Sequence, residues 1–406
     1  MSPSRFFCPI TVLVAIASGC VAQSVDERAY FNNPEAIRAA SAVARTSGGQ
    51  LPAPLHELRR MADKALKQGP FTVTGKQQIP PSGDRHDYMS LSPYWWPDPS
   101  KPDGKPYIRR DGEVNPEREK IPDRDQLRRL ALAIENLSLA YAVFADERYA
   151  AKASALLDAW FLDRETRMNP NMQFAQAVIG RSEGRGVGLI EARHFLRILE
   201  GVDLLEGSPA WKDEQSNTFR AWFESFLTWM RESPNGRDER DAPNNHGTWY
   251  HVQIARYAMA VAKDSLARAI LSDVGRERVA STVMPDGSQP LELARTDSWG
   301  YSLFNLEALM ALASLGERAG VDLWNYVTSD GRSIRRALDY LLPFAKGTST
   351  WTYPTIRGKN NDRLVPLLLM ASRVWGDPRY ADLARQFAGS DWERGRYRIT
   401  VLPMVP

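Results

Sequence analysis

Residues 241–250, with the sequence Asp-Ala-Pro-Asn-Asn-His-Gly-Thr-Trp-Tyr, form the densest group of side chains that could do chemistry. Pro243 and Asn244 are typical start signals of a helix. Asn245 and His246 would then lie beside free backbone N–H groups at the positive end of the helix dipole, where a carboxylate is favoured. Taken alone, Asn244 would be only an N-cap and His246 only a buried histidine. The combination of two asparagines, a histidine and the neighbouring aromatic rings predicts a binding site for a carboxylate instead.

Residues 292–301, with the sequence Glu-Leu-Ala-Arg-Thr-Asp-Ser-Trp-Gly-Tyr, form a second group just ahead of a predicted helix. Arg295 supplies a permanent cation, Trp299 a flat apolar face and Tyr301 a phenol. The alternative is structural, with Arg295 in a salt bridge to Asp297 and Tyr301 packed in the core. In the chemical interpretation, Arg295 would favour the phenolate form of Tyr301, which could then transfer protons.

Two further segments, residues 82–97 and 171–194, carry aromatic, amide and basic side chains. Aromatic rings stack on the apolar faces of sugars while polar neighbours bind the hydroxyl groups, so the segments predict a glycan cleft. The alternatives are that the aromatics of residues 82–97 clamp a loop onto helices, and that Arg193 and His194 form a solvated helix face. The expected binding residues of the two segments are His86, Tyr88, Trp95, Trp96, Gln176, Arg181, Arg185 and His194.

The composition excludes several classes of function. The 52 Lys and Arg residues against 49 Asp and Glu residues give a net charge of +3, and the charges are interleaved, so nucleic acid is not an expected partner. There is no His-Glu-x-x-His, Gly-x-Ser-x-Gly or Walker motif, and Leu189 follows the Gly-Arg-Gly-Val-Gly run where a dinucleotide fingerprint requires Gly. We therefore expect no metal and no cofactor.

The first 22 residues read as an export segment, with Arg5 ahead of an apolar run at residues 6–17 that is too short to span a membrane. Cys20 could carry a lipid anchor, and both cysteines lie in this segment, so the mature protein would have no disulfide. We expect an exported protein, periplasmic or anchored to the outer membrane of a bacterium, with residues 23–406 as a single domain.

Apolar residues recur at helical spacing through most of the chain, and the connections are mostly short. This pattern predicts an all-α fold, an (α/α) toroid of paired antiparallel helices with long aromatic-rich binding loops. Residues 71–122 are expected to be an ordered binding loop region, and residues 396–406 fit either a short strand or a strap. The predicted helices cover residues 34–45, 55–67, 130–144, 148–162, 195–205, 219–230, 250–261, 266–283, 303–315, 333–344, 364–374 and 377–387.

The runs at residues 87–97, 173–188, 244–246 and 295–301 occur in the order found in alginate lyase domains. Over roughly residues 55–387 the sequence resembles a bacterial polysaccharide lyase of the alginate lyase superfamily, and it is most similar to the branch acting on glucuronan or alginate. The most specific part is Asn-Asn-His at 244–246 combined with Arg295 and Tyr301. The resemblance implies an (α/α) toroid with a cleft in which an acidic polysaccharide is cleaved by β-elimination.

The residue types also fit this reaction, which removes the C5 proton of a uronate and expels the oxygen at C4. Asn245, His246 and Arg295 would neutralise the carboxylate, and Tyr301 would transfer the proton. In glucuronate and mannuronate the proton and the oxygen lie on the same face, so Tyr301 could act as base and acid. In guluronate they lie on opposite faces, so His246 would be the base and Tyr301 the acid.

Two other classes of function remain open from the sequence. A glycoside hydrolase on the same toroid would use a carboxylate pair, drawn from Asp84, Asp87, Glu183 and Asp297. A non-catalytic lipoprotein would capture the acidic glycan for a partner without forming a product.

Overall fold

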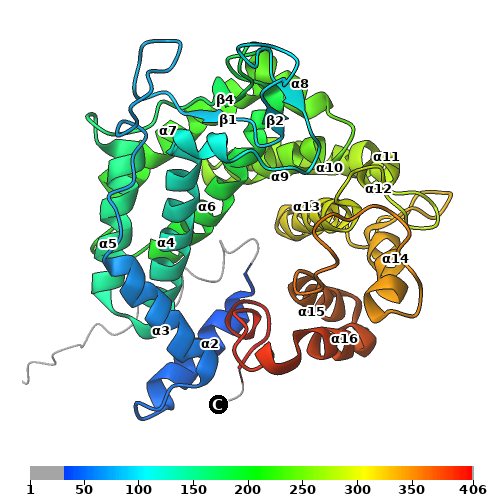
Figure 1. Ribbon diagram of the computed structural model, residues 1–406. Coiled ribbons are helices and arrows are strands. Elements are labelled where there is room, and N and C mark those ends of the chain that lie inside the picture. Colours follow the sequence, from blue (N-terminus) through cyan, green and yellow to red (C-terminus); the bar gives the residue numbers. More distant parts are fainter. Residues whose placement is uncertain (1–31, 405–406) are drawn as a thin grey trace, which may run out of the picture.

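The helices of the computed structural model form a ring around an open centre, an α/α toroid as predicted (Figure 1). The structure describes residues 32–404, so the expected export segment and Cys20 lie outside the described residues. The chain begins the ring with α2 and α3, and after α16 its last short helix, α17, packs on these two (Figure 1). The backbone N–H of Asn33 donates to the carbonyl of Thr400 at 2.7 Å, which joins the two ends.

Amphipathic periodicity explains most helices, because the buried positions recur every three or four residues. No helix among residues 32–404 is long and apolar enough to cross a membrane. The α-helices are α2 (Pro34–Thr46), α3 (Ala53–Leu66), α4 (Asp123–Phe144), α5 (Glu147–Leu157), α6 (His194–Leu205), α7 (Asp213–Glu232), α8 (Pro234–Asp241), α9 (Asn245–Ala260), α10 (Asp264–Val274), α11 (Ala280–Thr282), α12 (Pro290–Leu293), α13 (Ser298–Ala319), α14 (Ile334–Lys346), α15 (Leu364–Trp375), α16 (Pro378–Ala388) and α17 (Tyr397–Thr400).

Short strands and tighter or wider helical turns occur between these helices. Strand β1 (Met89–Leu91) pairs in parallel with β4 (Phe174–Ala177), and β2 (Trp95–Trp96) pairs antiparallel with β3 (Ile108–Arg109). The 3₁₀ segments are η1 (Pro116–Lys120), η3 (Gly186–Arg193) and η5 (Gly389–Asp391), and the π-helical segments are η2 (Asp158–Leu162) and η4 (Gly275–Val279).

The structure corrects three details of the sequence-based helices. The helix expected at residues 266–283 is interrupted by the π-helical turn η4, which separates α10 from α11. Helix α8 was not predicted, because its residues are almost all polar and only Gly236 and Glu239 are buried. The tail, which was undecided between strand and strap, contains the short helix α17 packed on α2.

Residues 71–122 are an ordered region held to the ring by buried polar contacts as well as by apolar packing. The Lys76 ammonium lies 2.9 Å from the Asp123 carboxylate with both side chains fully buried, and it also donates to the carbonyls of Val73, Arg85 and Asp87. A buried ion pair is tolerated where further hydrogen bonds satisfy it. These contacts fix the region onto the start of α4, beside the centre of the ring.

Candidate active site

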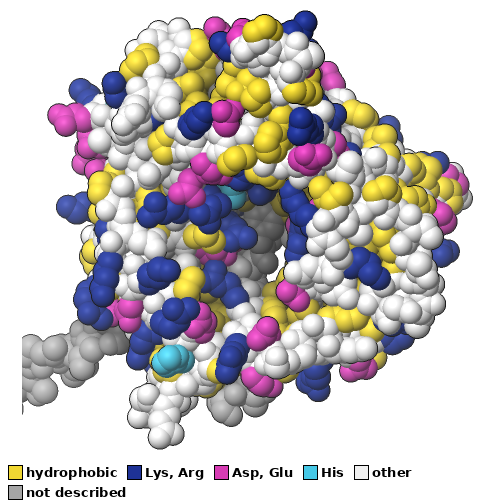
Figure 2. Space-filling model, viewed as in Figure 1, with side chains coloured by type: hydrophobic (Ala, Val, Ile, Leu, Met, Phe, Trp, Pro, Cys, Tyr) yellow, Lys and Arg dark blue, Asp and Glu magenta, His cyan; other side chains and the backbone are white. Residues whose placement is uncertain are grey.

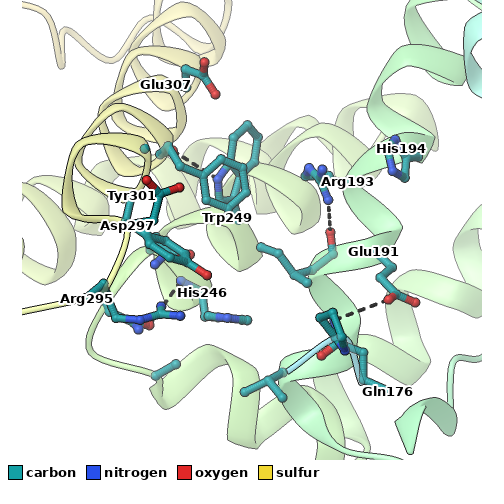
Figure 3. A pocket seen from close by; sticks show the side chains of 18 of the residues that line it. Gln176, Glu191, Arg193, His194, His246, Trp249, Arg295, Asp297, Tyr301 and Glu307 are labelled. Atoms are coloured by element: carbon teal, nitrogen blue, oxygen red, sulfur yellow. Dashed lines mark hydrogen bonds between the residues drawn. The ribbon is translucent and has the colours of Figure 1, made fainter. Parts of the chain in front are cut away.

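A cavity of about 1410 Å³ occupies the centre of the toroid. Figure 2 shows the hollow, with Lys and Arg side chains gathered around it. In Figure 3, Tyr301, Arg295 and His246 lie on one side, Gln176, Glu191, Arg193 and His194 on the other, and Trp249 between them. We call the first side the catalytic corner, made of Asn245, His246, Arg295 and Tyr301, and the second side the arginine wall, made of Arg185, Glu191, Arg193 and His194.

Helix α9 begins in the catalytic corner with Asn244 as its N-cap, whose side chain accepts from the N–H of His246 at 3.2 Å. Asn245 donates to the Glu292 carboxylate with both its backbone N–H and its side-chain Nδ2, each at 2.7 Å. Burial raises the pKa of Glu292, and these bonds from Asn245 oppose the rise. The backbone N–H of Asn245, which we expected to be free for substrate, is therefore occupied by a protein carboxylate.

His246 is held from behind by Glu239 of α8. Its Nδ1 lies 2.8 Å from Glu239 Oε1, so Nε2 is the nitrogen left for the cavity. Glu239 is completely buried, and burial raises the pKa of its carboxyl group although His246 opposes the rise. When the pair holds two protons, Nε2 carries a hydrogen and donates; with one proton fewer, Nε2 can accept.

Arg295 lies between α12 and α13 and pairs with Asp111 in the loop after β3. Its Nε and Nη2 donate to the two carboxylate oxygens at 3.0 and 2.7 Å, a bidentate contact. Arg295 holds the pKa of Asp111 well below its usual range, although burial opposes the shift. The expected alternative partner, Asp297, accepts instead from the Thr355 hydroxyl at 3.1 Å.

Tyr301, in the first turn of α13, packs against Arg295, with the guanidinium carbon 3.7 Å from the centre of its ring. Its hydroxyl donates to the hydroxyl of Tyr94 at 2.9 Å. Burial, followed by Tyr94, raises the pKa of Tyr301, and this outweighs the lowering by Arg295. Arg295 thus favours the phenolate as expected, but burial and Tyr94 have the larger effect and favour the phenol in the unliganded protein.

Nine of the fifteen predicted site residues line this one cavity. They come from segments far apart in the sequence, the aromatic loop, β4, η3, α6, α9 and α13. The nine are Trp95, Gln176, Arg185, His194, Asn244, Asn245, His246, Arg295 and Tyr301.

The other six residues do not line this cavity, and for three of them burial contradicts the expected contact with substrate. Tyr88, Tyr250 and Trp299 are almost completely buried in the core, and the hydroxyls of Tyr88 and Tyr250 donate to Glu191 and to the Met230 carbonyl. Their apolar rings pack beneath the site. Near the outer face, His86 bonds the Arg167 carbonyl, Trp96 the Glu113 carbonyl and Arg181 the Tyr107 carbonyl.

The structure also corrects the alternative in which Arg193 and His194 form a solvated helix face, because both side chains line the cavity. Of the carboxylates considered for a hydrolase, only Asp297 lines it. Asp84 and Asp87 instead both accept from the side-chain amide of Asn169, each at 2.9 Å. The predicted carboxylate pairs are therefore not assembled in the cavity.

Sequence reasoning missed the residues that hold the catalytic corner in place: Asp111, Glu239, Glu292 and Tyr94. For Glu239, the sequence offered one signal, an acidic residue a few positions before the Asn-Asn-His run. Nothing in the sequence links Asp111 to Arg295 across 184 positions. Within the described part of the chain, no group of three His, Cys, Asp or Glu residues is arranged to hold a metal ion.

Comparison with known proteins identifies the family. The alginate lyase family profile matches residues 72–351. An alginate lyase from Bacteroides ovatus is 37% identical, covering 92% of this chain and 98% of that one, with a TM-score of 0.87. No curated protein matches the sequence.

A more distant structure shares the fold. Alginate lyase A1-III from Sphingomonas species A1 is 18% identical over 89% of this chain and 92% of that one, with a TM-score of 0.57. A variant of A1-III complexed with a tetrasaccharide gives the same TM-score at 17% identity, over 90% and 93% of the two chains. The family profile covers more than two thirds of the sequence, and the Bacteroides structure matches nearly all of it. This chain therefore belongs to the alginate lyase family of polysaccharide lyases.

Proposed function

We propose that this protein cleaves a uronate polysaccharide of the alginate or glucuronan type by β-elimination, leaving 4,5-unsaturated uronate ends. The observation that carries the proposal is the catalytic corner, in which a phenol, a guanidinium, an imidazole and an amide meet at one cavity. These groups suit a substrate that carries a carboxylate and must lose a neighbouring proton. A rival hydrolase would need a carboxylate pair across the scissile bond.

The amide of Asn245 and the imidazole of His246 neutralise the uronate carboxylate in this proposal. The Nδ2 of Asn245 carries two hydrogens, one of which is held by Glu292, and His246 Nε2 is the ring nitrogen left for the cavity. Hydrogen bonds aimed at the carboxylate strengthen as negative charge spreads onto it when the C5 proton leaves. Because Glu292 and Glu239 fix both side chains beforehand, little reorganisation is needed during the reaction.

Tyr301 transfers the proton and Arg295 adds positive charge beside it. In the resting protein Tyr301 is a phenol, so it is ready to protonate the departing C4 oxygen as an acid. With guluronate, His246 Nε2 would remove the C5 proton from the opposite face. With mannuronate or glucuronate, Tyr301 must first lose its proton, and displacement of Tyr94 by an incoming sugar would lower the pKa of Tyr301, since Tyr94 contributes to the rise.

The identity of the polymer and the site of action are also proposed rather than established. We propose export through the segment at residues 1–22 and action in the periplasm or, with a lipid on Cys20, at the outer membrane. The cavity lining carries cations and aromatic rings, which suit an acidic glycan.

The test is ultraviolet absorbance of the conjugated 4,5-unsaturated uronate during incubation of purified protein with polymannuronate, polyguluronate and glucuronan. A rise on at least one polymer is expected, and the three rates rank the substrates. New reducing ends without absorbance would indicate hydrolysis. Binding without any product would indicate a carbohydrate-binding protein, and either result would overturn the proposal.

A further inference from the structure

Arg193, at the end of η3, is a half-buried cation in the arginine wall, and no carboxylate among residues 32–404 forms an ion pair with it. Its Nη1 donates to the Ile190 carbonyl at 3.2 Å. Burial, followed by Arg124, lowers the pKa of Arg193 to about 10, so the side chain is still charged at neutral pH. A desolvated charge without a counter-ion is costly, and it favours the binding of an anion.

Two acidic residues, Glu191 and Glu307, act electrostatically on Arg193, but both are paired with other groups. Glu191 accepts from the hydroxyls of Tyr88 and Ser90 at 2.8 and 2.7 Å, and its other oxygen lies 3.5 Å from Arg124. Glu307 is paired with Arg363 through both oxygens, at 2.8 and 2.6 Å. The guanidinium of Arg193 is therefore left facing the cavity while its acidic neighbours are occupied.

An aromatic surface lies beside this cation. The rings of Trp249 and Phe304 lie 5.2 Å apart at an angle of 33°, and both residues line the cavity. The Arg193 guanidinium lies over the Phe304 ring at 5.4 Å. Trp249 lies between the arginine wall and the catalytic corner (Figure 3). A ring face next to a free cation can bind the apolar face of a sugar and its carboxylate together.

We infer that Arg193, with Trp249 and Phe304, forms a second uronate-binding position that holds the carboxylate of a residue next to the one cleaved at Tyr301. This inference rests on the proposed function, because it assumes that the cavity takes a uronate chain. It assigns Arg193 a role in binding the substrate and none in the proton transfers. The enzyme should therefore discriminate against chains in which that neighbouring carboxylate is missing.

His194, the next residue, responds to the positive charges at this place. Burial, followed by Arg193, Arg197, Arg124 and Arg128, lowers the pKa of His194 well below its usual range. The imidazole is thus neutral, and it does not add to the charge but can bond a hydroxyl group.

The experiment measures binding of a saturated tetra-uronate by calorimetry in protein carrying Tyr301→Phe, which prevents turnover. Arg193→Gln should weaken binding about 10-fold or more, as expected for a lost hydrogen bond between charged groups. The control is Arg148→Gln, which removes the same charge from an exposed residue of α5 that pairs with Asp146 outside the cavity. It should change the affinity by less than about twofold. Thermal melting checks that each variant is folded.

A second arm uses the same tetrasaccharide with its carboxylates reduced to alcohols. Arg193→Gln and its parent should bind this neutral ligand equally, because the carboxylate that Arg193 recognises is gone. In protein with Tyr301 intact, Arg193→Gln should raise KM and leave kcat within a few-fold. Equal affinities of Arg193→Gln and Arg148→Gln for the tetra-uronate would overturn the inference. Absence of unsaturated product from the unmutated protein would instead overturn the proposed function.

Discussion

The catalytic corner and the arginine wall face each other across one cavity, but they differ in whether carboxylates pair with their functional side chains. In the corner, carboxylates hold three groups: Glu292 holds Asn245, Glu239 holds His246 and Asp111 holds Arg295. In the wall, Arg193 bonds the Ile190 carbonyl, and no carboxylate within residues 32–404 pairs with it. Pairing fixes the orientation of a side chain and compensates part of its charge, whereas an unpaired cation keeps its full charge for a ligand.

This difference indicates a division of labour. Proton transfer and charge neutralisation during a reaction need atoms held within a fraction of an ångström, which the paired corner provides. Recognition of an adjacent sugar tolerates looser geometry and gains from uncompensated charge. Two variants of the corner, the pH dependence of the reaction and the buried carboxyl group of Glu200 in α6 test this comparison, in order of decreasing expected effect.

Tyr301→Phe should have the largest effect. Removing the phenol deletes the group proposed to transfer the proton, so kcat should fall by about 10³-fold, within the usual range for general acid–base catalysis. The cavity shape is kept, so affinity for a uronate oligosaccharide should stay within a few-fold. Ultraviolet assays and calorimetry give the two numbers. Near wild-type turnover would remove Tyr301 from the mechanism and point to Tyr94 or His246.

Asp111→Asn should release Arg295 from its bidentate partner while conserving shape. We expect kcat/KM to fall about 10- to 100-fold, since small misplacements of a catalytic group are costly. Asp98→Asn is the matched control, because Asp98 lies in the same loop region and its carboxylate accepts from the backbone N–H and hydroxyl of Ser100, away from the cavity. An unchanged rate for Asp111→Asn would mean that Arg295 is positioned by its stacking on Tyr301 alone.

The pH dependence of kcat/KM should differ between substrates. The raised pKa of Tyr301 means that phenol predominates through neutral and mildly alkaline pH. If Tyr301 acts first as a base, the reactive phenolate fraction rises about tenfold per pH unit below its pKa, so the rate should increase from pH 7 to 9. If it acts only as an acid, the rate should be flat there. We expect a rise with polymannuronate or glucuronan and a flat profile with polyguluronate.

Glu200→Gln should have the smallest effect, on stability alone. Glu200 of α6 is buried, its Oε1 has no hydrogen-bond partner among residues 32–404, and burial raises its pKa to about 8. The carboxyl group of Glu200 binds its proton more tightly in the folded protein than in the unfolded chain. The free energy of unfolding of the wild type should therefore fall as the pH rises from about 4.5 to about 8. Glutamine removes that dependence.

Thermal melting at pH 5 and pH 8 tests this prediction. The advantage of Glu200→Gln should appear at pH 8 and be nearly absent at pH 5, with a shift of about 2 °C for each kcal/mol. Glu214→Gln, on the exposed face of α7, should show no such difference. A variant less stable than wild type at both pH values would show that Glu200 is ionised and paired in the folded protein.

The helices and the four residues of the catalytic corner could be predicted because their evidence is local in the sequence. Apolar spacing marks a helix within a few turns, and Asn245 and His246 follow a recognisable N-cap. The sequence was less informative about aromatic residues. Tyr88, Tyr250 and Trp299 were expected to bind sugar, but a tyrosine or tryptophan in a polar segment packs into the core equally well.

The sequence by itself determined a helical chain, its aromatic loop region and a family of chemistry, because periodicity and short motifs act through neighbouring residues. Only the tertiary structure decided that Asp111 pairs with Arg295 and that Arg193 is left without a carboxylate from the described part of the chain. Both facts depend on how distant segments meet when the ring closes. Electrostatic energy varies with distance and burial in space, and the order of residues along the chain specifies neither for such pairs.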